Sequence, residues 1–279
     1  MAIEILPLSQ ALGAEITGID LGQGVPAAAF DKIRGSWLRH KLILFRNQDL
    51  SPQDQLRFAR MFGALQAVRT ATDIVGEDQY AMHVANRPVD GKPGILPDGE
   101  MQFHTDQCYY ECPSRATLLF AIEIPATGGN TRFLDAGKAY DALAAEEKAR
   151  LCRMQVFNVY DYGRNPTIKG AEVAADAPRF VHPMVIVHPE TGARLLFANR
   201  LMTDHIVGLA RPQSDRILAR VFDHAEQSRF IYDHVWTPGD LVMWDNFAVM
   251  HARTDFDPAE TRVLRRIAVK GPRPAGIPR

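Results

Sequence analysis

Two candidate metal ligands stand two residues apart in the stretch Gln102-Phe103-His104-Thr105-Asp106. Side chains of an extended chain alternate between its two faces, so His104 and Asp106 would point at one centre. A neutral imidazole and a carboxylate suit a first-row divalent metal, and a second histidine would complete the 2-His-1-carboxylate set that leaves iron(II) with open positions. Taken alone, a His-x-Asp motif is more often a surface loop or a satisfied polar pair.

A third ligand comes from much farther along the chain. His251 follows Trp244-Asp245-Asn246 and the strand expected to begin at Asp240. A pair of ligands close in sequence and a distant third ligand fit a metal site built on strands. The competing histidines are interpreted as surface or satisfied side chains: His40, His182, His188, His205, His224 and His234.

The arginine-rich stretch 262–269 is expected to be a strand with two different faces. Alternation places Arg262 and Arg266 on one face, while Val263, Arg265 and Ile267 share the apolar face that helices should cover. Four residues separate the first two arginines by ~13 Å of strand, which predicts two anion sites. Two alternatives stay open, namely a solvated edge strand whose arginines oppose aggregation, and an acidic side chain that pairs with Arg266.

The composition is that of an ordinary globular protein. Hydrophobic residues make up 46% of the 279 residues, and 32 basic against 33 acidic residues give a net charge of −1. This balance gives no electrostatic basis for a nucleic-acid or membrane surface. No apolar run spans a membrane, the N-terminus lacks a signal-peptide pattern, and three cysteines are too few for a disulfide framework. We expect a cytoplasmic enzyme that acts on a small molecule, and we leave a homo-oligomer open.

Many short strands and few helices are expected around these residues. Strands are predicted at 3–6, 14–19, 41–45, 80–86, 115–124, 131–134, 229–236, 240–245 and 262–269, with a hairpin at 185–198. Helices are predicted at 27–40, 52–62, 136–153 and 217–225, the second capped by Ser51. Residues 87–100 and 161–180 lack periodicity and are expected to be active-site loops. The pattern predicts one β-rich (α+β) domain over residues 1–279, with helices packed outside the sheets.

These motifs together resemble the taurine and 2,4-dichlorophenoxyacetate dioxygenase (TauD/TfdA) family of Fe(II)/2-oxoglutarate-dependent oxygenases. The resemblance rests on His104-Thr105-Asp106, the turn 127–131, Trp244-Asp245-Asn246, His251 and Arg262. It runs from about residue 10 to residue 270 and includes 13–16 and 58–63.

The resemblance implies a double-stranded β-helix, or jelly roll, with the metal inside one end. It implies that His104, Asp106 and His251 bind iron, and that Thr131 and Arg262 hold the distal carboxylate of 2-oxoglutarate. Arg266 would bind the acidic group of the prime substrate. The implied reaction uses O2 and hydroxylates a small organic anion, with succinate and CO2 as co-products.

The chain departs from the family pattern near the substrate. Phe103 stands where members often carry tryptophan, and Val68 stands where taurine enzymes carry a substrate-contacting histidine. Tyr109 and Tyr110 add aromatic surface. We expect Phe103 and Tyr109 to form an apolar wall that favours an aryl or longer alkyl anion over taurine.

Two other functions are weighed against the oxygenase. The spacing His104-x3-Cys108-x3-Cys112 would align zinc ligands of a hydrolytic or structural site on a helix, although Pro113 opposes a helix there. A non-catalytic jelly-roll binding protein would keep the site without turnover. The identity of the bound metal distinguishes the zinc protein from the oxygenase. Succinate production distinguishes the oxygenase from the non-catalytic binding protein.

Overall fold

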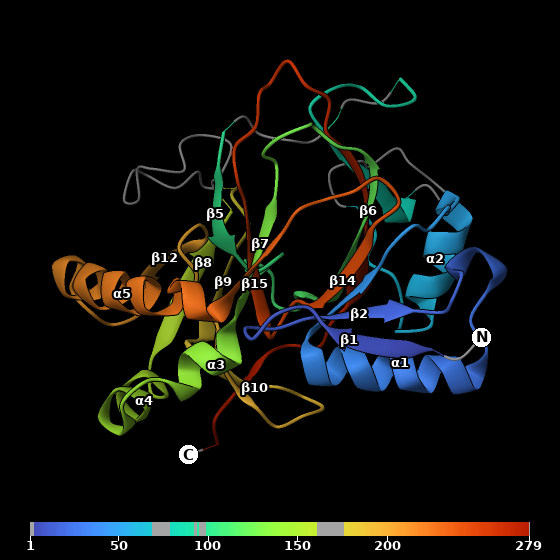
Figure 1. Ribbon diagram of the computed structural model, residues 1–279. Helices are drawn as coiled ribbons and strands as arrows, with labels where there is room; N and C mark the ends of the chain where they lie inside the picture. Colours follow the sequence, from blue (N-terminus) through green and yellow to red (C-terminus); the bar gives the residue numbers. More distant parts are fainter. Residues whose placement is uncertain (1–2, 69–78, 92–93, 95–98, 161–175, 279) are drawn as a thin grey trace.

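The computed structural model describes residues 3–68, 79–91, 94, 99–160 and 176–278, and antiparallel sheets dominate it (Figure 1). The large sheet has the order β1-β2-β3-β14-β6-β16-β4 in the described chain. Its strands are Glu4–Pro7, Ala14–Thr17, Leu42–Phe45, Leu241–Asp245, Ser114–Glu123, Val263–Lys270 and Ala81–Ala85, in that order. Its neighbouring strands run antiparallel except for the parallel pair β2 and β3.

A smaller sheet, here called the ligand sheet, has the order β13-β7-β15-β5. Its strands are Ile231–His234, Thr131–Asp135, Val249–Arg253 and Met101–His104. The chain passes from β14 of the large sheet to β15 of the ligand sheet through a short turn, and side chains of both sheets share one apolar core. This core joins Leu119, Trp244 and Leu264 to Phe133 and Val249.

Two further small sheets and three helices complete the side of the molecule around the ligand sheet (Figure 1). One sheet has the order β12-β8-β9, and the other has the order β11-β10-β17. The strands are Thr203–Ile206, Gln155–Val159, Arg179–Pro183, Arg194–Leu196, Val185–Val187 and Ala275–Gly276. The helices are α3 (Ala136–Asp141), α4 (Ala145–Leu151) and α5 (Arg211–Ala225).

Helices α1 (Ala27–His40) and α2 (Pro52–Arg60) cover the outer face of the large sheet (Figure 1). Ser51 caps α2 in a capping box with Asp54, as its sequence position predicted. Their apolar stripes bury Ile33, Trp37, Leu56, Phe58 and Ala59 against strand residues that include Ile43, Phe45, Leu118, Met243 and Ile267. The predicted β-rich architecture with helices outside the sheets is confirmed.

The two faces predicted for the arginine-rich strand are also confirmed. Ile267 and Val269 pack under the helices, while Leu264 belongs to the core between the sheets. The edge-strand alternative is wrong, because β16 lies between β6 and β4. Arg265 shares the helix-covered face and donates to Gln55 Oε1 and to the Leu50 carbonyl, each at 2.7 Å.

Several predicted elements need correction. The helix expected over 136–153 is divided into α3 and α4, because Ala144 between them has an extended backbone with a ψ of 151°. Tyr140 and Leu151 are both buried in the core. The irregular stretch 161–180 was extended too far, because Arg179 and Phe180 belong to β9. Residues 161–175 of this stretch, and 92–93 and 95–98 of the other predicted loop, lie outside the described residues. Strands β8, β9, β12, β15 and β17 were missed, and β5 was expected only as an extended stretch. No helix in the described chain is both long enough and apolar enough to cross a membrane.

The buried pair Gln55 and Arg265 gives a test of this packing. Gln55→Ala would leave the buried guanidinium without its side-chain acceptor, so we expect the free energy of unfolding to fall by roughly 1.5–3 kcal/mol. Gln53→Ala is the matched control, since Gln53 lies exposed on the same helix. Urea denaturation of both variants measures the difference, and equal stabilities would contradict the assigned role of Gln55.

Candidate active site

The three predicted metal ligands converge between the two sheets. His104 is the last residue of β5 and lies opposite His251 of β15 in the antiparallel register. Asp106 Oδ1 lies 3.9 Å from Nε2 of each histidine. One ligand atom from each residue lies within 4.8 Å of the other two. Two imidazole nitrogens and one carboxylate oxygen on one side of a centre fit a divalent first-row metal with open coordination positions.

The protonation of the histidines suits metal binding. His104 Nδ1 lies 2.9 Å from the carbonyl oxygen of Gln102. Since a carbonyl only accepts, Nδ1 must carry the hydrogen, and Nε2 keeps its lone pair for a metal. Burial lowers the pKa of His104, and burial together with His104 lowers that of His251 well below its usual range. Both rings are therefore neutral at neutral pH, the form in which an imidazole can bind a metal.

The carboxylate of Asp106 is held by charged and polar neighbours. Burial alone would raise the pKa of Asp106, but Arg266, His251 and His104 outweigh burial and hold the pKa well below its ordinary value. Arg266 Nη2 donates to Oδ2 at 2.7 Å, and Thr117 Oγ1 donates to the same oxygen at 2.8 Å. Oδ1 is thus the oxygen that faces the histidines. Arg266 has the acidic protein partner that the sequence analysis left open.

Arg262 and Thr131 form a second polar region. Arg262 is 2% exposed, its Nε donates to the Gly129 carbonyl at 3.0 Å, and no carboxylate of the described residues pairs with it. Burial and the nearby Arg253 lower the pKa of Arg262 to about 9. The buried Thr131 accepts a 2.9 Å hydrogen bond from Trp236 Nε1, so its own hydroxyl hydrogen is available to an acceptor. This arrangement can bind an anion.

The turn before β7 needs glycine to let Arg262 approach. Gly129 has a φ of +64°, and a Cβ there would lie 3.0 Å from the Nε of Arg262. A side chain at this position would therefore crowd the guanidinium as well as strain the backbone.

The structure separates the two residues predicted to form the apolar wall. The rings of Tyr110 and Tyr160 lie 4.7 and 4.8 Å from that of Tyr109. Burial, Tyr160 and Asp106 raise the pKa of Tyr109 well above its usual value. The phenol therefore lies within electrostatic reach of Asp106. Phe103 precedes His104 in β5 and lies on the opposite face of the ligand sheet, where the guanidinium of Arg132 lies 5.5 Å from its ring.

Sequence reasoning missed several polar and apolar neighbours of the site. Thr117 holds the Asp106 carboxylate, and Met82 of β4 has its sulfur 3.7 Å from Arg266 Nη1. Asn246 bonds both the backbone N–H and the carbonyl of Asp106. Alternation along the predicted strands 80–86 and 115–124 could have placed Met82 and Thr117 on inward faces. Their contacts with other strands depend on sheet register, which the sequence does not specify.

Most of the competing histidines have other partners, as predicted. The pairs are His182 with the Tyr110 carbonyl, His188 with Asp245, His205 with Asp204, His224 with the Ala139 carbonyl and His234 with Asp240. His40 is the last residue of α1.

The zinc alternative lacks its geometry. Residues 105–113 form turns and bends, so no helix aligns the cysteines with His104. Cys108 is buried and Cys112 is exposed. The metal-capable group found in the described chain consists of His104, Asp106 and His251.

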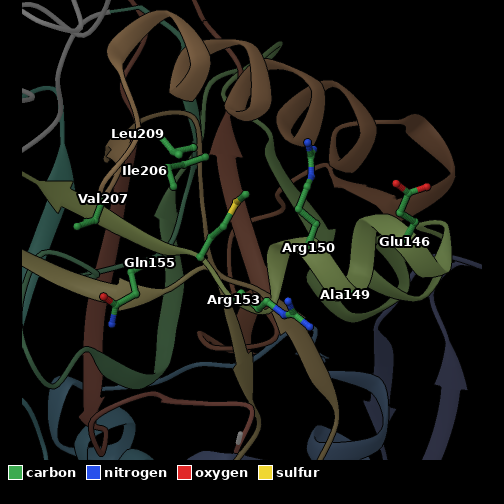
Figure 2. Close-up of a pocket in the computed structure, with 9 residues that line it drawn as sticks. Glu146, Ala149, Arg150, Arg153, Gln155, Ile206, Val207 and Leu209 are labelled. Atoms are coloured by element: carbon green, nitrogen blue, oxygen red, sulfur yellow. The ribbon is translucent and has the colours of Figure 1, made fainter.

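A separate surface pocket of about 620 Å³ lies beside α4, β8 and β12. Figure 2 shows Glu146 and Arg150 projecting from α4, with Ile206, Val207 and Leu209 on another wall. None of its lining residues belongs to the predicted site.

Comparisons with known proteins agree with this geometry. The model of the family described as "Taurine catabolism dioxygenase TauD, TfdA family" matches residues 4–268. The (S)-phenoxypropionate/alpha-ketoglutarate-dioxygenase of Sphingobium herbicidovorans is 32% identical, with 97% of this chain and 96% of that protein covered. Pentalenolactone F synthase of Streptomyces arenae is 31% identical, with 98% and 97% covered.

A solved structure shares the fold over nearly the whole length. The crystal structure of AAD-2 in complex with Mn(II) and N-oxalylglycine has a TM-score of 0.82 and 26% identity, and the match covers 99% of this chain and 100% of that chain. Alpha-ketoglutarate and 2-oxoglutarate are two names for one compound. The chain therefore belongs to the taurine catabolism dioxygenase TauD, TfdA family, and is a 2-oxoglutarate-dependent dioxygenase.

Proposed function

We propose that this enzyme uses iron(II), 2-oxoglutarate and O2 to hydroxylate a small organic anion, with succinate and CO2 as co-products. The observation that carries the proposal is the convergence of His104 Nε2, Asp106 Oδ1 and His251 Nε2 between the sheets. Bound iron supplies the oxygen-activating chemistry, and the side chains of the protein position the reactants. Where the hydroxylated carbon bears an ether or sulfate ester oxygen, or a sulfonate sulfur, the product collapses with cleavage of the carbon–oxygen or carbon–sulfur bond.

Arg262 and Thr131 are the proposed site for the distal carboxylate of 2-oxoglutarate. A buried guanidinium without a carboxylate partner is costly, and a bound anion removes that cost. Arg262 presents its terminal N–H groups as a planar fork that suits a carboxylate. The Thr131 hydroxyl, oriented by Trp236, adds a second donor. The match to the family motif at both positions and the AAD-2 complex with N-oxalylglycine support this assignment.

Arg266 is the proposed anchor for the acidic group of the prime substrate. One of its terminal nitrogens holds Asp106, while among the described residues the acceptor found for Nη1 is the weakly accepting Met82 sulfur at 3.7 Å. A guanidinium carries five N–H groups, so Arg266 can bind Asp106 and a substrate anion together. Met82 offers apolar surface beside it. We place the neutral phenol of Tyr109, which lies within electrostatic reach of Asp106, on the same side of the pocket. We infer an aryl or longer alkyl acid, a class that includes the phenoxypropionate named for the Sphingobium relative.

We also infer the finer architecture and location. The shared core of the two facing sheets, together with the family match, supports a double-stranded β-helix in one domain over residues 1–279. All three cysteines are free, which supports a cytoplasmic location.

The metal site can be tested by removing one ligand. His251→Ala should abolish stoichiometric iron(II) binding and substrate-dependent succinate release, because two remaining ligands do not complete the set. His224→Ala is the matched control, since His224 binds a backbone carbonyl on α3. Anaerobic titration with iron(II) and a succinate assay provide the measurements. Full activity of His251→Ala would show that His251 is not a metal ligand.

The 2-oxoglutarate site predicts a specific loss of co-substrate affinity. Arg262→Ala removes a charge-assisted bond of ~1.5–3 kcal/mol, so the 2-oxoglutarate concentration needed for half-maximal activity should rise at least about tenfold. Lys270→Ala removes an exposed cation from β16, the strand that Arg262 directly precedes, and should leave the titration unchanged. An unaltered 2-oxoglutarate requirement in Arg262→Ala would rule out the role.

The substrate anchor predicts discrimination by charge. Wild type should oxidise an aryloxy acid far better than its neutral amide, and Arg266→Ala should lose most of this preference because the anchoring charge is gone. The ratio of kcat/KM for acid and amide is the measurement. Arg266→Ala also removes the contact with Asp106, and any general loss of activity that results affects acid and amide alike and cancels in the ratio. If wild type shows no preference, or the variant keeps the full preference, Arg266 does not anchor the acid.

A further inference from the structure

Asp106 lies beyond the strand that carries the first ligand. Strand β5 ends at His104, and residues 106–109 form a turn in which Gln107 has a φ of +60°. Within the described chain, the Asp106 N–H and carbonyl make no backbone–backbone hydrogen bond. Some other group must therefore fix the backbone of this ligand.

Asn246 supplies those hydrogen bonds. Its Oδ1 accepts from the Asp106 N–H at 3.0 Å, and its Nδ2 donates to the Asp106 carbonyl at 2.9 Å. Nδ2 also donates to the Ser114 carbonyl at 2.8 Å, which ties the turn to the first residue of β6. The amide thus pairs with both backbone groups of Asp106, as a residue of a neighbouring strand would.

Asn246 is itself fixed. It is fully buried, and its backbone N–H donates to the Arg115 carbonyl at 3.0 Å. The preceding Asp245 accepts from the backbone N–H groups of Phe247 and Ala248, and from His188 Nε2 at 2.8 Å. The turn between β14 and β15 therefore presents the amide at one defined place.

Thr117 fixes the other end of the ligand. Its hydroxyl donates to Asp106 Oδ2 at 2.8 Å and is fully buried in β6. With Oδ2 engaged, only Oδ1 faces the histidines, so the carboxylate is set to bind through one oxygen. A carboxylate free to rotate could bind a metal through both oxygens, as carboxylates do in some metal sites, and would occupy a position that the co-substrate needs.

We propose that Asn246 and Thr117 are positioning residues that hold Asp106, by its backbone and by its outer oxygen respectively, as a one-oxygen metal ligand. The inference rests on the metal site of the proposed function. It assigns to Asn246 and Thr117 a specific effect on metal affinity, beyond any effect on folding. Loss of outer-shell partners of this kind typically weakens metal binding about 10–100-fold.

The test measures Mn(II) binding to metal-free protein by calorimetry, which needs no turnover. Asn246→Asp keeps the shape but replaces the donor to two carbonyls with an acceptor, and should raise the Mn(II) Kd about 10–100-fold. Thr117→Val keeps the side-chain shape and removes one charge-assisted hydrogen bond to the Asp106 carboxylate, for which we also expect about a 10–100-fold rise. Thermal unfolding of each variant is recorded alongside.

The matched controls come from another buried pair. Asn158 and Thr203 are fully buried, and the Thr203 hydroxyl donates to Asn158 Oδ1 at 2.7 Å. They belong to the sheet β12-β8-β9, which is separate from the ligand sheet. Asn158→Asp and Thr203→Val should lower the unfolding temperature while leaving the Mn(II) Kd unchanged. If the controls lose as much affinity as the test variants, the effect is general destabilisation and the positioning roles are wrong.

The remaining outcomes are also decisive. Folded Asn246 and Thr117 variants with the wild-type Kd would overturn the proposal, and Thr117→Val alone decides if Asn246→Asp does not fold. His251→Ala is included to monitor the metal site itself. If wild type binds no Mn(II), or if His251→Ala binds it equally well, the proposed metal site fails and this inference fails with it.

Discussion

A carboxylate inside an apolar core is stable only where positive charges and hydrogen-bond donors replace the water that it has lost. Asp106, between the two sheets, therefore needs such partners from the protein. Arg266, Thr117, His104 and His251 meet the condition, and they come from β16, β6, β5 and β15. The large sheet and the ligand sheet must therefore both be paired in their native register before the site exists. Formation of the site is coupled to completion of the fold.

The two interior arginines differ in electrostatic environment. Arg266 has a carboxylate partner in the protein, whereas the described chain offers Arg262 none. An anion bound at Arg262 therefore neutralises a buried charge that has no other partner among the described residues. An anion bound at Arg266 would interact with a guanidinium whose charge Asp106 already partly neutralises. This difference suits an obligatory co-substrate at the first position and an exchangeable substrate, selected by shape as well as charge, at the second.

Local patterns predicted what depends on neighbouring residues in the chain. Helical spacing located α1, the Ser51 cap located α2, and strand alternation assigned Arg262 and Arg266 to the inner face of β16. The pairing of His251 with His104 could not be derived, because register between strands distant in sequence depends on the whole sheet. The family resemblance provided that connection.

The missed residues share one physical cause. Asn246 and Thr117 act on Asp106 across turns and strands, so their roles become visible only when those elements are placed. The position of Phe103, by contrast, follows from strand alternation alone. Its neighbour His104 faces the proposed metal site, so Phe103 points to the other face of the ligand sheet. The break between α3 and α4 was also not predicted, because the alanine-rich sequence has no proline or glycine at 142–144 to mark it.

The central claim is that one interior site holds the metal, with 2-oxoglutarate directed to Arg262. A crystal structure with Mn(II) and 2-oxoglutarate, with anomalous scattering to locate the metal, tests it most directly. We expect an anomalous peak bounded by His104 Nε2, Asp106 Oδ1 and His251 Nε2, and a distal carboxylate bonded to Arg262 and Thr131. A peak at Cys108 or elsewhere, or a distal carboxylate bound at Arg266, would contradict it.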